Sequence, residues 1–168
     1  MALFRSRGFR QFVLLLCAWL VIFIDQGVKN VAIANLTPGA PVDFIGSLVR
    51  LNLTANDSAA FSIGFGATWI FSIISSLAAL ALMWYSFKIQ TIGWAVMGGI
   101  LLGGVVGNLI DRLTREPGFA VGHVIDYLQI PFNFPIFNIA DMAIVTICSL
   151  TVIRIMRGDK IGLSRNNK

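Results

Sequence analysis

Four aspartates lie within or beside strongly apolar stretches of the sequence: Asp25, Asp111, Asp126 and Asp141. An ionised aspartate at the centre of a membrane helix costs about 2.5–3.5 kcal/mol on an insertion scale. Such residues persist where they pair with another group or perform chemistry. These four acids are therefore the candidates that the rest of the sequence has to explain.

Two of them, Asp126 and Asp141, are candidates for a catalytic pair. Asn138 precedes Asp141 by three residues, which places both on one helical face. Two carboxyl groups that share a site cannot both ionise, so one stays protonated while the other activates water. Such a pair hydrolyses a peptide bond without a metal ion or a covalent intermediate. Taken separately, Asp126 is also explained as a surface loop acid, and Asp141 as an acid favoured by a helix N-terminus.

Other hydrolytic sites fit the sequence poorly. His123 is the only histidine, which excludes a zinc site of the HExxH type. The sequence also lacks the GxSxG pattern of many serine hydrolases. We interpret His123 as a hydrogen-bonding group, and carboxylate catalysis remains the best enzymatic hypothesis.

Two further polar groups stand at the ends of apolar segments. Asn108, Asp111 and Arg112 share a helical face through spacings of three and four residues. Asp25 precedes Lys29 by four residues, the favourable order for an ion pair on a helix. We interpret both groups as architectural, because they would orient loops or grip a lipid headgroup.

The composition indicates an integral membrane protein, with 57% hydrophobic and 12% charged residues, against about 25% charged residues in soluble domains. Its formal charge of +5 favours contact with anionic lipids over nucleic acid, because the charges lie at the ends of apolar segments. A membrane helix needs about 20 mainly apolar residues. Four segments meet this requirement within a single domain of residues 1–168: 12–31, 69–87, 92–110 and 136–156.

The basic residues predict the orientation in the membrane. With four spans both termini lie on one side, and 9 of the 13 Lys and Arg residues fall there. Short loops rich in Lys and Arg stay in the cytoplasm. We therefore expect cytoplasmic termini and chemistry near the outer face. The nine residues are Arg5, Arg7, Arg10, Lys88, Arg154, Arg157, Lys160, Arg165 and Lys168.

Two outer segments connect the predicted spans. In residues 32–68, apolar and polar side chains alternate from Val49 to Asn56, which predicts a strand in a small sheet on the outer membrane surface. Residues 111–135 are expected to form an interfacial loop. In the third span, Gly99, Gly103 and Gly107 predict close packing with another helix of the same chain, and we expect a monomer.

Five motifs in this order resemble the lipoprotein signal peptidase family, the type II signal peptidases of bacteria. Each motif is short, but together with four spans they form a specific pattern that covers nearly the whole chain. The motifs are Asp25–Lys29, Asn56–Phe61, Gly107–Arg112, His123–Asp126 and Phe137–Asp141.

The resemblance implies a four-helix fold in the bacterial inner membrane, with an extracytoplasmic β-cradle. It implies an aspartic endopeptidase that uses no metal or other cofactor. Its substrate would be a diacylglyceryl-modified prolipoprotein, cut before the lipidated cysteine. Asp126 and Asp141 match the family's catalytic pair. The supporting positions that match are Asp25, Lys29, Asn56, Asn108, Asp111, Arg112 and Asn138.

The sequence departs from the family pattern at two positions. Ser58 stands where the family usually has glycine, and Tyr127 where it more often has phenylalanine. Two other hypotheses stay open beside the peptidase. A non-catalytic relative would bind lipid or lipoprotein with the same fold, but both aspartate motifs are intact. A small transporter would relay protons, but no inverted repeat is visible and the acids cluster at one face.

Overall fold

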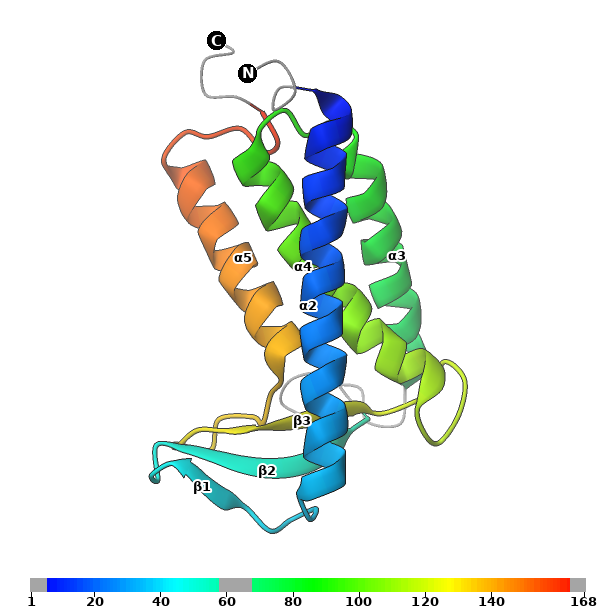
Figure 1. The fold of residues 1–168 in the computed structure, drawn as a ribbon, viewed down its shortest axis with the longest axis vertical. Coiled ribbons are helices and arrows are strands. Elements are labelled where there is room, and N and C mark those ends of the chain that lie inside the picture. Colours follow the sequence, from blue (N-terminus) through cyan, green and yellow to red (C-terminus); the bar gives the residue numbers. More distant parts are fainter. Residues whose placement is uncertain (1–5, 58–67, 164–168) are drawn as a thin grey trace.

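The structure, a computed structural model, describes residues 6–57 and 68–163. Its four long helices run roughly side by side, and a small sheet lies across one end of them (Figure 1). The start of α2 and the end of α5 both lie at the opposite end. The helices are α2 (Arg7–Asn35), α3 (Thr68–Ser86), α4 (Ile92–Thr114) and α5 (Ile139–Met156), and the strands are β1 (Val42–Ile45), β2 (Val49–Asn56) and β3 (Val124–Gln129).

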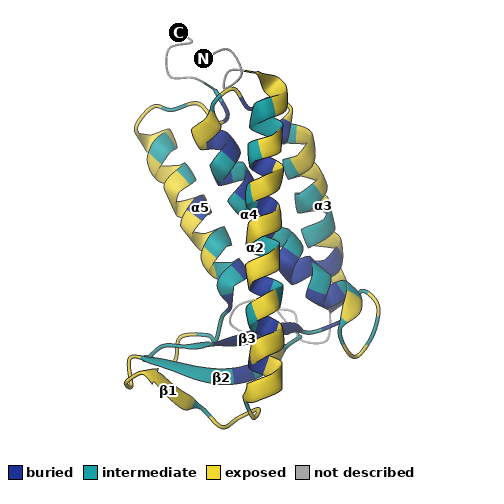
Figure 2. Cartoon of the chain, viewed as in Figure 1, coloured by how far each residue is buried: buried dark blue, intermediate teal, exposed yellow. Residues whose placement is uncertain are grey.

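All four helices are long and apolar enough to cross a membrane. Their outward faces are largely exposed, whereas buried residues concentrate on α4 and on the sides that face it (Figure 2). In water such apolar faces would be unfavourable, but in a bilayer they contact lipid tails. The chain is therefore a multi-pass membrane protein, and the predicted four-helix fold with a small sheet is confirmed.

The helix ends differ from the sequence expectation by a few residues. The first helix starts at Arg7 rather than near residue 12, because the Ser6 hydroxyl accepts the backbone N–H of Phe9 at 3.1 Å and caps it. The fourth starts at Ile139 rather than near 136, because Phe137 pairs with Leu128 in a β-bridge. The third continues past residue 110 to Thr114, so Asp111, predicted at the boundary between this helix and the following loop, lies within the helix.

Helix α4 occupies the centre of the bundle, where glycines let its neighbours approach closely. A Cβ atom at Gly103 would lie 2.7 Å from the carbonyl oxygen of Ala18 on α2. A Cβ atom at Gly104 would lie 2.7 Å from the carbonyl oxygen of Ala140 on α5. Real side chains do not tolerate these distances, so α2 and α5 pack backbone to backbone against α4. The predicted close packing within the chain is confirmed.

The sheet is antiparallel with the order β1-β2-β3. The predicted alternating strand is β2. The third strand was not predicted, and residues 111–135 are therefore more than an interfacial loop. Residues Val124, Asp126 and Tyr127 of β3 are all buried, so this strand is covered on both faces and shows no alternation for a period-two pattern to detect.

The end of α2 fixes the sheet beneath the bundle. Ala32 on α2 packs with Leu53 of β2 and Tyr127 of β3 in a small apolar core. Because successive side chains of a strand point to opposite faces, the Tyr127 contact with α2 turns Asp126 to the other face of the sheet. That face carries the site described next.

Candidate active site

Asp126 and Asp141 come from different elements and are brought together by a short hairpin. After β3 the chain reverses, and Leu128 and Phe137 exchange backbone hydrogen bonds of 2.8 and 3.0 Å. This pairing places Asn138 and the first turn of α5 beside β3. Asp126 is buried in the strand, and Asp141 is the third residue of the helix.

Asn138 contacts both carboxyl groups. Its amide Nδ2 donates to Oδ1 of Asp126 at 2.6 Å, and its backbone N–H donates to Oδ2 of Asp141 at 3.1 Å. Its Oδ1 accepts the backbone N–H of Asp141 at 3.0 Å, which completes a capping box at the start of α5. The Asn138 side chain is fully buried. One residue therefore fixes the helix start and both acids at once.

Two further asparagines hold the remaining carboxyl oxygens. Asn56, at the end of β2, donates to Oδ2 of Asp126 at 2.8 Å. Asn108, on α4, donates to Oδ1 of Asp141 at 2.7 Å. All four carboxyl oxygens of the pair thus accept an N–H donor, and four different elements supply the groups.

Burial changes the acidity of Asp126, which is 2% exposed. Loss of water, and after it the neighbouring Asp141, raise its pKa from 3.8 to about 7. The hydrogen bonds from Asn56 and Asn138 act in the opposite direction. Near neutral pH this carboxyl is therefore partly protonated and can donate a proton.

A second, fully buried layer lies behind the pair. The Lys29 ammonium has three N–H donors, and each meets an acceptor: Asp25 Oδ2 at 2.8 Å, Asp111 Oδ2 at 2.8 Å and Asn108 Oδ1 at 2.9 Å. Lys29, Asp25 and Asp111 are all 0% exposed. Of the two architectural roles predicted for these residues, their complete burial favours the one of orienting neighbouring segments over that of contacting a lipid headgroup.

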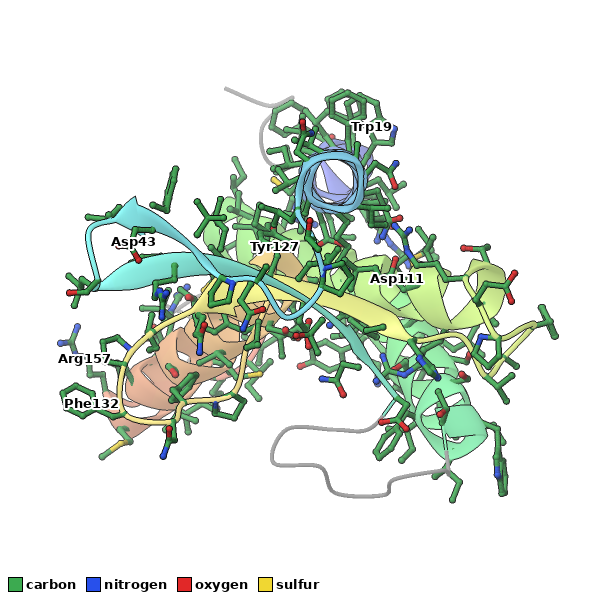
Figure 3. The ribbon with its side chains drawn as sticks, turned by 90° about the horizontal axis from the view of Figure 1, so that it is seen from below. Trp19, Asp43, Asp111, Tyr127, Phe132 and Arg157 are labelled. Carbon is green, nitrogen blue, oxygen red and sulfur yellow. The ribbon has the colours of Figure 1, made fainter. Side chains whose placement is uncertain are left out.

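This ion cluster also holds the backbone next to each acid of the pair. Oδ1 of Asp25 accepts the N–H of Ala140, which precedes Asp141, at 3.0 Å. Oδ2 of Asp111 accepts the N–H of Ile125, which precedes Asp126, at 3.2 Å. Seen from the sheet end, Asp111 lies close to the end of α2, on the opposite side of the molecule from Phe132 (Figure 3). The cluster therefore ties α2, α4, β3 and α5 together behind the carboxyls.

A cavity of about 1200 Å³ opens in front of the pair. Its polar end contains Asp126 and Asp141, and Arg112 beside them places its guanidinium 5.6 Å from the ring centre of Phe71. Apolar residues of α3 and α5, among them Ile74 and Val145, line the remainder. The cavity therefore suits a ligand with a polar reactive part and an apolar body.

Comparison with known proteins decides the family. The family model described as Signal peptidase (SPase) II matches residues 17–157. The chain belongs to the signal peptidase II family. Its membership confirms the predicted resemblance and the prediction that the chain is a peptidase.

Individual relatives agree with this assignment to the signal peptidase II family. The lipoprotein signal peptidase of Leifsonia xyli is 47% identical over 90% of this chain and 69% of its own length. That of Rhodococcus jostii is 36% identical over 89% of this chain and 75% of its own. A bacterial membrane enzyme solved at 2.3 Å resolution matches this structure with a TM-score of 0.78 and 26% sequence identity. The match covers 92% of this chain and 94% of the chain of that enzyme.

The predicted site residues of this signal peptidase II relative fall into two connected groups. Those that line the cavity are Asn56, Asn108, Arg112, Asp126 and Asp141, and the buried Asn138 contacts both of these acids. Those of the buried cluster are Asp25, Lys29 and Asp111. His123 is not among the described residues that line the cavity. Its backbone N–H donates to the carbonyl of Glu116 at 2.9 Å. Ser58 lies outside the described residues.

Sequence reasoning missed two members of the buried network, Gln26 and Arg115. Gln26 Nε2 donates to Oδ1 of Asp111 at 3.0 Å, and Arg115 Nε donates to the same oxygen at 2.7 Å. One signal was present, because Arg115 follows Asp111 by four residues and so faces the same side of a helix. The predicted helix end near 110 concealed it.

Proposed function

We propose that the chain removes signal peptides from diacylglyceryl-modified prolipoproteins, with Asp126 and Asp141 as its catalytic pair. The observation that carries the proposal is Asn138, which contacts both carboxyls at the polar end of a largely apolar cavity. The relatives named as lipoprotein signal peptidases support the substrate class. The bond to be cut is the one before the lipidated cysteine.

The arrangement supports general acid–base hydrolysis. Asp126, whose pKa is raised to about 7, starts protonated and donates to the oxygen of the scissile carbonyl. Asp141 starts ionised and takes a proton from the water that attacks the carbonyl carbon. When the C–N bond breaks, the proton on Asp141 passes to the leaving amine and Asp126 regains its own from the hydroxyl of the new carboxylic acid. No covalent intermediate is needed.

The cavity supports a substrate that is partly embedded in lipid. Its apolar wall is built from α3 and α5, which each pack against α4 and are long enough to span the membrane. Acyl chains and the apolar part of a signal peptide would lie along this wall. Their burial would leave the peptide bond at the carboxyl pair, where the asparagines fix both acids.

We propose a location in the bacterial inner membrane, with cytoplasmic termini and the carboxyl pair near the outer face. The uneven distribution of Lys and Arg supports this orientation. Helix α2 begins, and helix α5 ends, on the side remote from the sheet (Figure 1). The supporting roles of Asn56, Asn108 and Asn138 in holding the acids are part of the same proposal.

The decisive experiment is incubation of the purified protein in detergent with a synthetic diacylglyceryl lipopeptide, followed by mass analysis. We expect a single cut before the lipidated cysteine. Asp126→Asn and Asp141→Asn should each lower turnover by several orders of magnitude while the protein stays folded. Asp43→Asn is the matched control, since Asp43 is exposed on β1 and pairs with Arg50. Near-normal turnover in either pair variant would end the aspartic mechanism, and a wild-type protein that binds without cutting would favour the non-catalytic alternative.

A further inference from the structure

The buried cluster behind the pair contains more negative than positive charge unless Arg115 is included. Asp25 and Asp111 carry two negative charges, and Lys29 supplies one positive charge. Arg115 supplies the second, through Nε to Oδ1 of Asp111 at 2.7 Å. Its side chain is 19% exposed whereas that of Asp111 is 0% exposed. The guanidinium therefore reaches the sealed cluster from the rim and brings it to neutrality.

The contacts of Asp111 divide between its two oxygens. Oδ1 accepts from Arg115 and from Gln26, at 2.7 and 3.0 Å. Oδ2 accepts from Lys29 at 2.8 Å and from the backbone N–H of Ile125 at 3.2 Å. The donors on Oδ1 therefore hold the carboxylate in the orientation in which Oδ2 faces β3, the strand that carries Asp126.

Arg115 also joins α4 to α2. One of its terminal nitrogens donates to Oε1 of Gln26 at 3.4 Å and to Oδ1 of Asn30 at 3.2 Å. Gln26 in turn donates to the carbonyl oxygen of Gly107 on α4 at 3.0 Å. A planar guanidinium with several fixed donors suits such a junction, and a lysine would supply the charge without the same geometry.

The position of Arg115 in the chain is tightly defined. Its backbone N–H donates to the carbonyl of Asp111 at 2.9 Å, where α4 ends. Gly122 donates to the carbonyl of Arg112 at 3.0 Å, and a Cβ atom on Gly122 would lie 2.7 Å from the carbonyl oxygen of Arg115. The chain therefore returns to β3 by packing directly on the residue that holds Asp111.

We propose that Arg115 is a positioning residue for the hydrolysis, which neutralises the buried cluster and orients Asp111 so that Ile125, and with it Asp126, is held in place. Its described hydrogen bonds run to Asp111, Gln26 and Asn30, so it acts on the reaction through Asp111. This inference rests on the proposed catalytic pair.

The charge of Arg115 has a measurable consequence at the pair. The charged groups that face Asp126 are Asp141 from α5, Lys29 from α2 and Arg112 from α4. Loss of the Arg115 charge leaves the cluster of Asp25, Lys29 and Asp111 with a net negative charge. This charge disfavours the ionised form of the carboxyl pair electrostatically. The acid limb of the kcat profile should then move to higher pH.

The test compares Arg115→Gln and Arg115→Lys with the wild type. The quantities measured are kcat and KM for one lipopeptide across pH, together with thermal unfolding. For Arg115→Gln we expect kcat to fall about tenfold with KM changed less than about twofold, and the acid limb of the kcat profile to move upward. Arg115→Lys should restore the acid limb, because it keeps the charge, and should recover part of kcat.

Arg154→Gln is the matched control. Arg154 is also partly buried and pairs with a carboxylate, Asp159, at 2.8 Å, but it lies at the end of α5 remote from the sheet. We expect its loss to lower thermal stability without moving the acid limb. An unchanged kcat profile in Arg115→Gln would overturn the inference. So would a loss of kcat that leaves the limb in place and that lysine does not rescue.

Two further measurements separate the possible failures. Asp126→Asn and Asp141→Asn are assayed on the same lipopeptide: turnover in either means that the proposed pair is wrong, whereas two inactive variants beside an unaffected Arg115→Gln overturn the Arg115 inference alone. If Arg115→Gln does not fold, the kcat profile of Arg115→Lys tests the inference instead. A lower kcat with an unmoved acid limb supports the inference, and a wild-type kcat overturns it.

Discussion

The amide nitrogen of Asn138 lies 2.6 Å from Oδ1 of Asp126, while the same residue caps the helix that carries Asp141. A helix cap is usually a local matter of stability, worth about 1 kcal/mol. Here the cap and the orientation of the acids share one side chain. The start of α5 therefore cannot shift without disturbing the geometry of the pair.

This dual role predicts that two substitutions of Asn138 will separate its effect on stability from its effect on turnover. Asn138→Ala loses both the cap and the contact with Asp126, so both stability and turnover should fall. Asn138→Ser keeps a side-chain oxygen for the cap but is too short to reach Asp126. Its melting temperature should fall less than that of Asn138→Ala, while kcat falls at least tenfold. Thermal unfolding and lipopeptide turnover measure the two effects, and a fully active Asn138→Ser would contradict the shared role.

The raised pKa of Asp126 predicts two effects of pH. Because this carboxyl must start protonated, kcat/KM should decline as pH rises above about 7, where Asp126 loses its proton. The stability effect has the same sign. The folded state favours the protonated form, so its contribution is complete below the ordinary pKa of 3.8 and is lost as pH rises through about 7.

Asp126→Asn isolates the stability effect because asparagine stays neutral throughout this range. The stability of the variant relative to the wild type should increase between pH 4 and pH 8. Chemical unfolding in detergent at several pH values gives the difference directly. A difference that stays constant over this interval would show that Asp126 is not titrating as described.

Close packing of α4 predicts a contrast between two glycines. Gly103→Ala would place a methyl group against the carbonyl of Ala18 and the Cβ of Val21, each 2.7 Å away. The helices would have to separate, and we expect a loss of about 1–3 kcal/mol. Gly27→Ala is the control, since nothing lies within 4 Å of its added methyl group, and a helix gains from alanine. Equal melting temperatures for the two variants would contradict this account of the packing.

The sequence predicted the parts of this structure that depend on long or regular patterns. Four apolar segments predicted four helices, because a bilayer requires such lengths. The alternation of apolar and polar side chains from Val49 to Asn56 predicted β2, because successive side chains of a strand point to opposite faces. It did not predict β3, whose residues are covered on both faces. Nor did it predict the contact of Asn138 with Asp126, which exists only once the hairpin places the two side by side.

Some residues of the site could likewise be predicted from the sequence and others could not. The cost of acids in an apolar segment identified Asp126 and Asp141 without any contact being known. Arg115 was only one of the four basic residues that were not assigned to the side of the termini. Its role depends on the last turn of α4 continuing past residue 110, and helix ends are the part of a pattern that sequence predicts least well. Contacts such as that between Lys29 and Asn108 join residues 79 positions apart and follow from the packing of helices.

The proposed orientation predicts the labelling of single cysteines. With Cys17 and Cys148 replaced, a cysteine at residue 165 should be protected from an impermeant thiol reagent in intact cells, because the termini are cytoplasmic. A cysteine at Asp43, which is exposed on β1, should react. The measurement is the extent of labelling before and after the membrane is permeabilised. Labelling at 165 in intact cells would reverse the orientation.

The departure at Ser58 predicts that this position matters less than Asn56. Asn56→Ala removes the amide that donates to Oδ2 of Asp126 at 2.8 Å, leaving an oxygen of a buried carboxyl without that donor. Losing a hydrogen bond to a buried acid of the pair should lower kcat about tenfold or more.

Ser58 lies outside the described residues, and its expectation comes from backbone chemistry. A non-glycine residue held in a sparsely populated conformation costs about 1–3 kcal/mol, which an outer loop seldom tolerates without a compensating contact. We therefore expect glycine to be accepted at this position. Ser58→Gly should stay active with at most a modest change in KM. Both variants are measured side by side on one lipopeptide. Loss of activity in Ser58→Gly together with a normal Asn56→Ala would mean that the match of Asn56–Phe61 to the family motif is misplaced.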